Sequence, residues 1–373
     1  MIKHNILIIG SGKIGTTVAT LLAKTNDYNV TLSDIKEPDT LITIYNNPIQ
    51  FVKLNIQQPD EVIKFIKSNK IQSIVSCLPF YLTIEVAKIA SKCDINYFDP
   101  TEDIATTNQV LELAKNNKGS FATQCGLAPG FISIAANSLM NNFDKIQNVK
   151  MRVGALSQNT SNSLNYSFTW SVDGVINEYI HPCIVIENGK KIQKPALGDL
   201  EEIIVDNYKY EAFHTSGGVG SLVDSYHGQV TNLDYKTMRY PGHCAKVSFI
   251  LNDLKLREKP QLVKQILENV IPHTQEDKVV IYVVVQGEKN GIFSEKTYSN
   301  TLYPSEIDGT NFSAIQMTTA TAICTIIDLV VTEKKLSGII KQEQVSINQF
   351  LANRFGSYYH KCSTNNKYQY FKG

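Results

Sequence analysis

The first third of the chain alternates short apolar runs with segments of helical periodicity. Residues 6–9 form an apolar run, and Ile14, Val18, Leu21 and Leu22 then recur at the spacing of one helix face. Similar runs predict strands at 30–33, 51–54, 74–78, 97–98 and 121–123, with helices starting at Pro59, covering 83–93 and including 110–114. Because these strands do not alternate with polar residues, we expect a parallel sheet covered by helices on both faces.

After about residue 130 the pattern changes to a period of two. This alternation is seen in Val149, Met151, Val153 and Ala155, and again in Tyr166, Phe168 and Trp170. Segments 279–285 and 296–303 flank Asn290-Gly291, which predicts a β-hairpin. Such strands are typical of a mixed or antiparallel sheet with one open face. Residues 312–333 return to a helical pattern.

The charge balance excludes some classes of partner. The 373 residues carry 36 Lys and Arg against 35 Asp and Glu, a net charge of +1, without a block of like charges. There is no field to attract a polyanion, so we expect no nucleic-acid partner. With 43% hydrophobic residues the chain can bury substantial cores, and its length fits two domains.

The cysteines and the apolar segments indicate the cellular compartment in which the protein is expected. Seven cysteines without a CxxC pair indicate reduced thiols and a cytoplasmic protein. The first apolar run is four residues long and a glycine turn follows, so we expect no signal peptide. Residues 317–331 contain several Thr and Asp328, which favours a buried helix over a membrane span. We therefore expect no association with a membrane. We also predict no bound metal, because no cluster of His, Asp or Glu has the spacing of metal ligands.

A dinucleotide-binding motif follows the first predicted strand. Gly10, Ser11, Gly12, Lys13, Ile14 and Gly15 form GxGxxG, and Asp34 lies 19 positions after Gly15 at the end of the second strand. Gly10 permits the tight turn, Gly12 lets the backbone approach a pyrophosphate, and Gly15 lets helix and strand pack closely. Asp34 would bind the adenosine ribose and repel a 2′-phosphate. We therefore predict NAD as the cofactor, with NADP disfavoured.

Cys77, Leu78 and Pro79 end the fourth predicted strand, where a doubly wound sheet places the middle of its cofactor. We predict cofactor contacts there, and packing alone explains the segment equally well. Cys77 has no neighbouring His or Lys and is not interpreted as a nucleophile.

Four further motifs indicate a resemblance to a known protein family. They read GLAPG at 126–130, WSVDG at 170–174, EAFHTSGG at 211–218 and YKTMRYPGH at 235–243. Together with the glycine motif they resemble the saccharopine dehydrogenase family, in the branch that includes lysine 6-dehydrogenases, from about residue 5 to about residue 340. The resemblance implies hydride transfer between a nicotinamide and an amine-bearing carbon of a lysine-type amino acid, and a homodimer formed through the second sheet.

One position separates branches of this family. Saccharopine reductases that form glutamate carry Asp within the GxxPG motif, where this chain has Ala128. Lysine 6-dehydrogenases resemble this sequence in having Ala, which tilts the expectation towards free lysine or a similar amino acid. Segment 96–103 is more acidic than expected for this branch, so a substrate other than lysine stays an alternative.

The fold class is therefore α/β, with a Rossmann doubly wound parallel sheet and an inserted α/β domain that has a mixed or antiparallel sheet. We expect a dinucleotide-binding domain at residues 1–130 and a substrate-binding and dimerisation domain at 131–310. Residues 311–360 would form helices packing back between the two, and 361–373 a loose polar tail.

Candidate substrate residues lie in the second half of the chain. Arg239 can hold a carboxylate bidentately with its planar guanidinium, although a pair with a surface Asp is the plain alternative. Thr215 and Ser216 offer hydroxyls on a glycine-rich turn, as do many turns formed for local reasons. Trp170 is the only tryptophan, and we predict a place in the core more readily than against a ligand.

Oxidising an amine-bearing carbon requires a base, because an ammonium has no lone pair. We predict His243 as this catalytic residue, near Arg239, with His214 as a second candidate. Asp173 and Glu102 stay open, and each histidine could instead be structural.

These features favour an NAD(P)-dependent oxidoreductase that acts on the CH–NH2 group of an amino acid. A saccharopine-type reductase acting on a secondary amine is the alternative within the family. A non-catalytic nucleotide-binding regulator is the alternative of another class.

Overall fold

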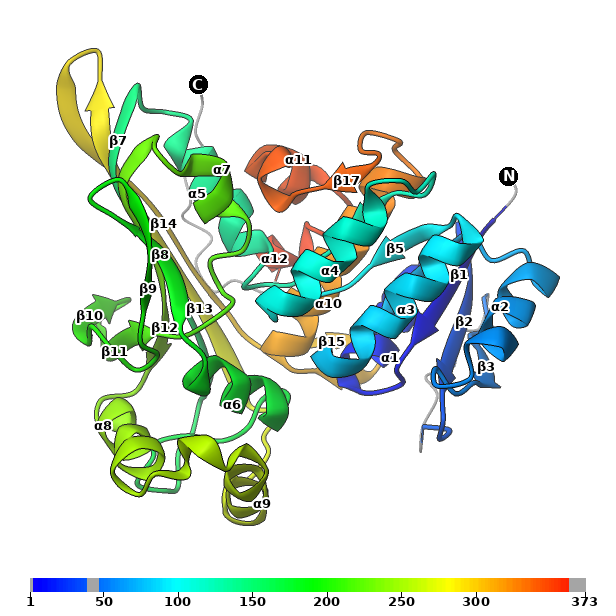
Figure 1. Cartoon of the computed structure of the whole chain (residues 1–373), viewed down its shortest axis with the longest axis horizontal. Helices are drawn as coiled ribbons and strands as arrows, with labels where there is room; N and C mark the ends of the chain where they lie inside the picture. The colour runs from blue at the N-terminus through cyan, green and yellow to red at the C-terminus, as the bar shows by residue number, and fades with distance from the viewer. Residues whose placement is uncertain (1–2, 39–46, 362–373) are drawn as a thin grey trace. The chain divides into compact units, whose positions relative to one another are not determined.

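The computed structural model describes residues 3–38 and 47–361. By their contacts these fall into two compact units, one formed by residues 3–38, 47–134 and 319–357 and the other by 135–318 and 358–361 (Figure 1). The tail predicted to be loose lies outside the described residues from position 362 onward. The first unit therefore contains the predicted nucleotide-binding region together with a C-terminal segment.

The first unit is built on a parallel sheet of seven strands. Its order is β17-β6-β5-β4-β1-β2-β3. The strands are β1 (His4–Ile9), β2 (Tyr28–Asp34), β3 (Gln50–Lys53), β4 (Ser73–Ser76), β5 (Asn96–Phe98), β6 (Phe121–Ala122) and β17 (Ile339–Ile340). The chain order reverses between β1 and β4, so the carboxyl ends of these two strands form the switch point where such sheets bind ligands.

Helices cover both faces of this sheet, as predicted. They are α1 (Lys13–Lys24), α2 (Pro59–Ser68), α3 (Phe80–Cys93), α4 (Ile104–Ala114), the start of α5 (Phe131–Met140), most of α10 (Ala314–Val331), η3 (Gln342–Gln344) and α11 (Ile347–Ala352). Residues of α2, α3 and α4 share one buried cluster with Leu7, Ile9 and Ile74 of the sheet. On the other face, the Cys324 thiol of α10 lies 3.9 Å from the Val18 carbonyl of α1.

Helix α10 confirms the predicted buried helix. It is long and apolar enough to cross a membrane, but 89% of it is buried inside the protein, as in a core helix. The acidic residue in it, Asp328, accepts hydrogen bonds from Tyr28 Oη (2.9 Å), Asn353 Nδ2 (2.8 Å) and Arg354 Nη2 (2.6 Å). A buried carboxylate held by so many donors is compatible with a protein core.

The second unit contains a mixed sheet. Its main path runs β10-β11-β12-β7-β13-β14, and β8 joins β12 and β9. The strands are β7 (Lys145–Ser157), β8 (Cys183–Glu187), β9 (Lys190–Lys194), β10 (Glu201–Val205), β11 (Tyr208–His214), β12 (Val230–Arg239), β13 (Asp277–Lys289) and β14 (Ile292–Leu302). Strands β15 (Ser305–Ile307) and β16 (Thr310–Phe312) form a separate pair.

Short helices surround this sheet. They are α6 (Val172–Ile180), α7 (Leu222–Tyr226), α8 (His243–Ser248), the π-helical turn η1 (Phe249–Asp253), η2 (Leu256–Glu258), α9 (Pro260–Val270) and α12 (Tyr358–Lys361). The predicted hairpin is confirmed as β13 and β14, whose turn holds Asn290 at φ 51° and Gly291 at φ 74°. These positive φ values explain the Asn-Gly pair.

The strand predicted from Tyr166, Phe168 and Trp170 is wrong. The segment has no strand, and Phe168 alone forms an isolated bridge, with His273. The alternation arises because Tyr166 and Phe168 turn inward into an aromatic cluster, where their rings meet edge to face at 5.4 Å. Ser171 then caps α6 by accepting a hydrogen bond from the Gly174 amide, which ends the segment.

Candidate functional site

The glycine turn after β1 has the shape that the sequence predicted. A Cβ on Gly10, which has φ +106°, would lie 2.7 Å from the Cys77 carbonyl oxygen, and one on Gly15 would lie 1.8 Å from the Gly10 carbonyl oxygen. These two glycines are therefore required by packing. A Cβ on Gly12 would meet no atom within 4 Å, so the protein itself does not need a glycine there. The space at Gly12 suits a ligand that approaches the backbone.

Helix α1 begins directly at this turn. Lys13 is exposed and Ile14 is half-buried at its first positions, and Gly12 at the N-cap provides no side-chain cap. The amide groups of a first helical turn and the positive end of the helix dipole favour a phosphate.

Asp34 ends β2 beside the turn. Its Oδ2 accepts hydrogen bonds from the Ser11 amide (2.7 Å) and the Ser11 hydroxyl (3.1 Å), and its Oδ1 accepts one from the Ile35 amide (2.7 Å). The carboxylate is thereby fixed next to Gly10 and Gly12. This is the position from which an acidic residue binds the ribose hydroxyls of a dinucleotide.

Cys77, Leu78 and Pro79 lie at the same edge of the sheet. The Cys77 amide donates to the Ile9 carbonyl at 2.8 Å, and Leu78 lies within 3.3 Å of the position of a Gly10 Cβ. The structure thus brings this segment to the switch point beside the glycine turn. Burial raises the pKa of the Cys77 thiol to about 12, so it is no nucleophile at neutral pH.

The glycine turn, the uncapped helix start and the fixed carboxylate together fit a nicotinamide dinucleotide. Gly12 leaves room for the pyrophosphate, the α1 amides would bind it, and Asp34 would hold the ribose. No group of three or more His, Cys, Asp or Glu able to hold a metal occurs within residues 3–38 and 47–361.

In the second unit, Arg239 lies at the end of β12 and is 2% exposed. Its Nε donates to Tyr179 Oη at 2.9 Å, and its Nη1 donates to Thr237 Oγ1 (3.2 Å) and the Met238 carbonyl (2.9 Å). The Tyr166 ring lies 5.2 Å below the guanidinium. Arg239 forms no ion pair with a carboxylate of the described residues, so a surface Asp does not explain it.

His243, the predicted base, contacts the same cluster. Its Nδ1 lies 2.9 Å from the Leu164 carbonyl and therefore carries the proton, so Nε2 accepts the hydrogen bond from Tyr179 Oη at 3.1 Å. Burial lowers the pKa of His243 to about 3, and the Arg239 charge acts in the same direction. A neutral imidazole with both nitrogens engaged is poorly suited to proton transfer. The geometry instead favours a role for His243 in positioning Tyr179 and, through it, Arg239.

Glu211 is a residue of this site that sequence reasoning missed. Its carboxylate accepts hydrogen bonds from the Gly242 amide (2.8 Å) and the Cys244 amide, on either side of His243. It also lies opposite Arg239 in the β11–β12 register. The sequence did contain a signal for Glu211, because a charged residue directly precedes the apolar pair Ala212-Phe213 in the EAFHTSGG motif. Glu211 holds the start of α8, and with it His243, in place.

The remaining substrate candidates have different surroundings. Thr215 is 1% exposed and its Oγ1 has no hydrogen-bond partner, while the Ser216 amide donates to the Glu178 carbonyl at 3.0 Å. Trp170 is half-buried against the aromatic cluster beside Tyr166 and Phe168. Ser216 therefore contacts α6 through its backbone, and Trp170 packs against the edge of the aromatic cluster.

His214 lies on the opposite face of the sheet from Arg239. It pairs with Lys236 in the β11–β12 register, and Lys236 alternates with Thr237, so the two side chains point away from the Arg239 face. Its Nε2 lies 3.2 Å from Asp199 Oδ2 and its Nδ1 lies 3.3 Å from the Tyr235 carbonyl. Burial lowers the pKa of His214.

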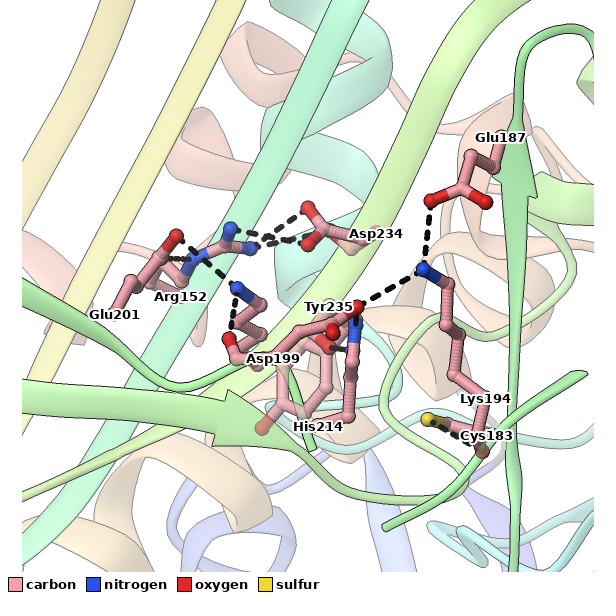
Figure 2. Close-up of polar contacts among 10 residues, drawn as sticks. Arg152, Cys183, Glu187, Lys194, Asp199, Glu201, His214, Asp234 and Tyr235 are labelled. Carbon is pink, nitrogen blue, oxygen red and sulfur yellow. Dashed lines mark hydrogen bonds and ion pairs between the residues drawn. The ribbon is translucent and has the colours of Figure 1, made fainter. Parts of the chain in front are cut away.

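Figure 2 shows that His214 belongs to a network of ion pairs on this face. The buried Arg152 binds both Glu201 and Asp234, and Lys194 joins Asp199 (3.0 Å) to Glu187 (2.6 Å). All its carboxylates are matched by cations. The network stabilises the strands and does not offer His214 to a ligand.

Asp173 and Glu102, the two acidic residues that stayed as alternative candidates for the base, also differ in their surroundings. Asp173 Oδ2 forms an ion pair with Lys264 Nζ of α9 at 2.7 Å, which gives it a structural partner. Glu102 follows β5 at the carboxyl edge of the parallel sheet and is half-buried. Burial raises the pKa of Glu102 to about 7, and the carboxylates of Asp103 and Asp99 act in the same direction. Glu102 thus has a pKa suited to a general base.

The fold and the glycine turn define the class as a two-domain dinucleotide-binding protein of the Rossmann type. Family models place the chain within this class. The saccharopine dehydrogenase NADP binding domain matches residues 6–123, and the saccharopine dehydrogenase C-terminal domain matches residues 126–357. The chain belongs to the saccharopine dehydrogenase family, a family of NAD(P)-dependent amino-acid oxidoreductases.

Known relatives and structures agree with this assignment. The chain is 26% identical over 203 residues to the mitochondrial alpha-aminoadipic semialdehyde synthase of Rattus norvegicus and 28% identical over 210 residues to that of Bos taurus. The match covers 51% of this chain but only 21% of each relative, so the chain spans a small part of these longer proteins.

Two solved structures share the fold over most of the chain. Apo saccharopine dehydrogenase (L-Glu forming) from Saccharomyces cerevisiae superposes with a TM-score of 0.68 at 14% identity, over 96% of both chains. Homospermidine synthase from Legionella pneumophila, solved with NAD, superposes with a TM-score of 0.63 at 12% identity, over 96% of this chain and 90% of the other. The predicted fold class is confirmed.

Proposed function

We propose that the protein is an NAD-dependent dehydrogenase that acts on the CH–NH2 group of an amino acid, similar to lysine 6-dehydrogenase. The observation that carries this proposal is the buried guanidinium of Arg239, which has no carboxylate partner in the described residues. A buried charge is costly without a counter-charge, so the site calls for an anionic ligand. The carboxylate of an amino acid supplies it, and a planar guanidinium binds a carboxylate well.

The chemistry needs few further groups. A nicotinamide dinucleotide held by the glycine turn, the start of α1 and Asp34 would supply a hydride acceptor for the amine-bearing carbon, and water would then hydrolyse the resulting imine to an aldehyde and ammonia. The amine must first lose a proton. Glu102 is the best-supported base, because its pKa of about 7 and its place at the carboxyl edge of β5 both suit proton transfer near neutral pH.

NAD is the preferred cofactor in this proposal. The family model for residues 6–123 is named for NADP. However, Asp34 holds its carboxylate beside the glycine turn through two hydrogen bonds from Ser11, and this negative charge opposes a 2′-phosphate at the adenosine ribose.

The substrate of the proposed reaction is a primary amine. Ala128 supports this, because the glutamate-forming reductases that the sequence resembles carry Asp at this position. The second candidate is a saccharopine-type reaction on a secondary amine. It is favoured by the similarity to alpha-aminoadipic semialdehyde synthase and to saccharopine dehydrogenase.

A panel of amines tests the proposal. The purified protein with NAD and L-lysine should produce NADH, measured by its absorbance, whereas saccharopine with NAD or NADP should give little. A reversed preference would favour the second candidate. Binding of either nicotinamide coenzyme without turnover on any amine would contradict both and favour a regulator.

A homodimer formed through the second sheet completes the proposal. The face opposite Arg239 carries Tyr208, which is 57% exposed, next to Tyr210 and Tyr240, and these rings surround the Lys278 ammonium at 4.2–5.6 Å. Tyrosine-rich surfaces are common in protein interfaces. Light scattering of the protein and of Tyr208→Glu should show a dimer that the substitution weakens, and a monomeric parent would reject this part.

A further inference from the structure

Loop 195–199, between β9 and β10, links the two faces of the second sheet. Its Leu197 is 9% exposed and belongs to the buried aromatic cluster that also contains Tyr179 and Phe213. Two residues further on, Asp199 contributes its carboxylate to the ion-pair network on the opposite face (Figure 2). The loop therefore connects this network to the cluster whose tyrosines contact the guanidinium.

The loop has a backbone conformation that needs support. Leu197 has φ 65° and Asp199 has φ 49°, both in the left-handed region that is costly for residues other than glycine. Two hydrogen bonds tie the loop to β11. The Leu197 amide donates to the His214 carbonyl at 2.8 Å, and the His214 amide donates to the Gly198 carbonyl at 3.1 Å. Such a conformation persists only where several contacts fix it, so the contacts of Asp199 contribute directly to the position of Leu197.

Asp199 makes three contacts with the network. Its Oδ2 lies 3.0 Å from Lys194 Nζ and 3.2 Å from His214 Nε2, and its backbone carbonyl accepts a hydrogen bond from Lys236 Nζ at 2.6 Å. The hydrogen bond from Lys194 is the largest cause of the lowered pKa of Asp199. The Asp199 side chain is half exposed, whereas those of His214 and Lys236 are buried. The carboxylate therefore holds the end of the loop from the far face of the sheet.

Phe213 connects this loop to Arg239. It shares the buried cluster with Leu197, and its ring lies 5.9 Å from the ring of Tyr179, whose hydroxyl accepts the hydrogen bond from the guanidinium. Phe213 also directly precedes His214, and neighbouring strand residues point to opposite faces. A contact that fixes His214 on the far face thus also orients Phe213. A displacement of the loop would therefore reach the phenol that orients Arg239.

We propose that Asp199 is a positioning residue for substrate binding, which acts from the opposite face of the sheet by holding loop 195–199 and, through Leu197 and Phe213, the orientation of Arg239. This inference rests on the proposed function, because it takes Arg239 as the residue that binds the substrate carboxylate. Asp199 itself touches neither substrate nor cofactor. Its loss should change the affinity for the amino acid and leave the chemical step and coenzyme binding as they are.

Asp199→Asn removes the charge and keeps a residue type that tolerates a positive φ, so the variant should fold. Its KM for the amino acid should rise about 2- to 30-fold, the range of such indirect effects, at unchanged kcat and NAD affinity. Trp170, the only tryptophan, packs on the same cluster, so its emission should shift to longer wavelength and be quenched more readily by acrylamide. Asp206→Asn is the control, because Asp206 has φ 52° and binds Thr301 Oγ1 at 2.8 Å in another turn. Either reading left at the parent's value in Asp199→Asn would overturn the proposal.

Two further variants keep the test decisive. Leu197→Ala should also raise KM, and Asp199→Asn added to it should raise KM little further, because residues that act through a shared contact are not additive. Effects that multiply in full would contradict the route through the loop. If Asp199→Asn does not fold, Lys194→Gln removes a partner of Asp199 and must still change both readings in the same direction. If the amine panel gives no NADH, the proposed oxidation fails, and Trp170 fluorescence alone decides whether Asp199 holds the cluster.

Discussion

Tyr179 Oη receives a hydrogen bond from Arg239 Nε at 2.9 Å, and the same hydroxyl donates to His243 Nε2 at 3.1 Å. One phenol therefore fixes the orientation of the guanidinium, and the imidazole fixes the phenol. Because Nη1 donates to Thr237 Oγ1 and to the Met238 carbonyl, Nη2 is the nitrogen of Arg239 that is left to bind a carboxylate.

Arg239→Ala should raise the KM for the amino acid about 30-fold or more, because loss of one member of a buried charge pair costs about 2–5 kcal/mol. Tyr179→Phe should raise KM less and leave kcat nearly unchanged, since it disturbs only the orientation. Steady-state kinetics would measure both, with NAD affinity as the internal reference. Tyr282→Phe, a half-buried tyrosine of β13, is the control. An unchanged KM in Arg239→Ala would remove this residue from substrate binding.

Gly12→Ala and Gly15→Ala form a matched pair. Gly12→Ala should fold with the stability of the parent but bind NAD more weakly, because a Cβ there enters the open space of the phosphate site. Gly15→Ala should lower the free energy of unfolding by about 1–3 kcal/mol or more, because its Cβ would lie 1.8 Å from the Gly10 carbonyl oxygen. Thermal unfolding and NAD titration separate the effects. Equal NAD affinity for Gly12→Ala and the parent would argue against a phosphate at this turn.

Asp34→Ala should weaken NAD binding and narrow the ratio of NAD to NADP affinity. The carboxylate that opposes the 2′-phosphate is lost, together with the bonds that Ser11 makes to it. Titration with both coenzymes measures the ratio. Glu37→Ala, just beyond β2 and exposed, is the control. A ratio that stays constant in Asp34→Ala would show that another residue selects the coenzyme.

Glu102→Gln should lower kcat about 10²–10⁴-fold, the usual contribution of a general base. In the parent, kcat/KM should rise with pH through about 7, as Glu102 loses its proton. The variant should lack this rise, and Glu112→Gln, an exposed carboxylate of α4, should keep it. A rise near pH 7 that persists in Glu102→Gln would assign the base elsewhere.

The buried His243 should make the protein sensitive to acid. Its folded pKa of about 3 lies below the ordinary 6.5, so the unfolded chain binds a proton that the folded protein excludes. Its neutral form therefore supports the fold fully above pH 6.5, and the support is lost as pH falls from 6.5 towards 3, by about 1.4 kcal/mol per pH unit. His243→Gln should flatten this slope in denaturant unfolding at several pH values, relative to the exposed His227→Gln. Parallel slopes for His243→Gln and the parent would contradict the shift.

Much of the first unit could be predicted because apolar runs and glycine spacing are local signals. The pattern located β1, α1 and the turn between them, and the structure places Gly10 and Cys77 together as expected. The second unit was harder. The hairpins β8–β9 and β10–β11 were missed although their turns, Asn188-Gly189 and Asp206-Asn207, have the positive φ values that such residues favour.

The site of the second unit depends on contacts between distant segments, which explains what the sequence did not reveal. Arg239 was found from a motif, but its partner Tyr179 lies 60 positions away and Glu211 contacts Gly242 across 31. His214 and His243 looked alike as candidate bases. The β11–β12 register puts His214 with Lys236 on the far face of the sheet, whereas the hydrogen bond from Tyr179 places His243 beside Arg239.

The alternation along β12 has a consequence for how this protein can change. Lys236 and Arg239 are three positions apart in this strand. Lys236 forms ion pairs on one side of the sheet, whereas Arg239 contacts Tyr179 and Tyr166 on the other. Deleting or inserting a single residue between them would exchange the two sides and send the guanidinium into the ion-pair network. Length variation within this strand should therefore be far rarer among functional variants than substitution at its exposed positions.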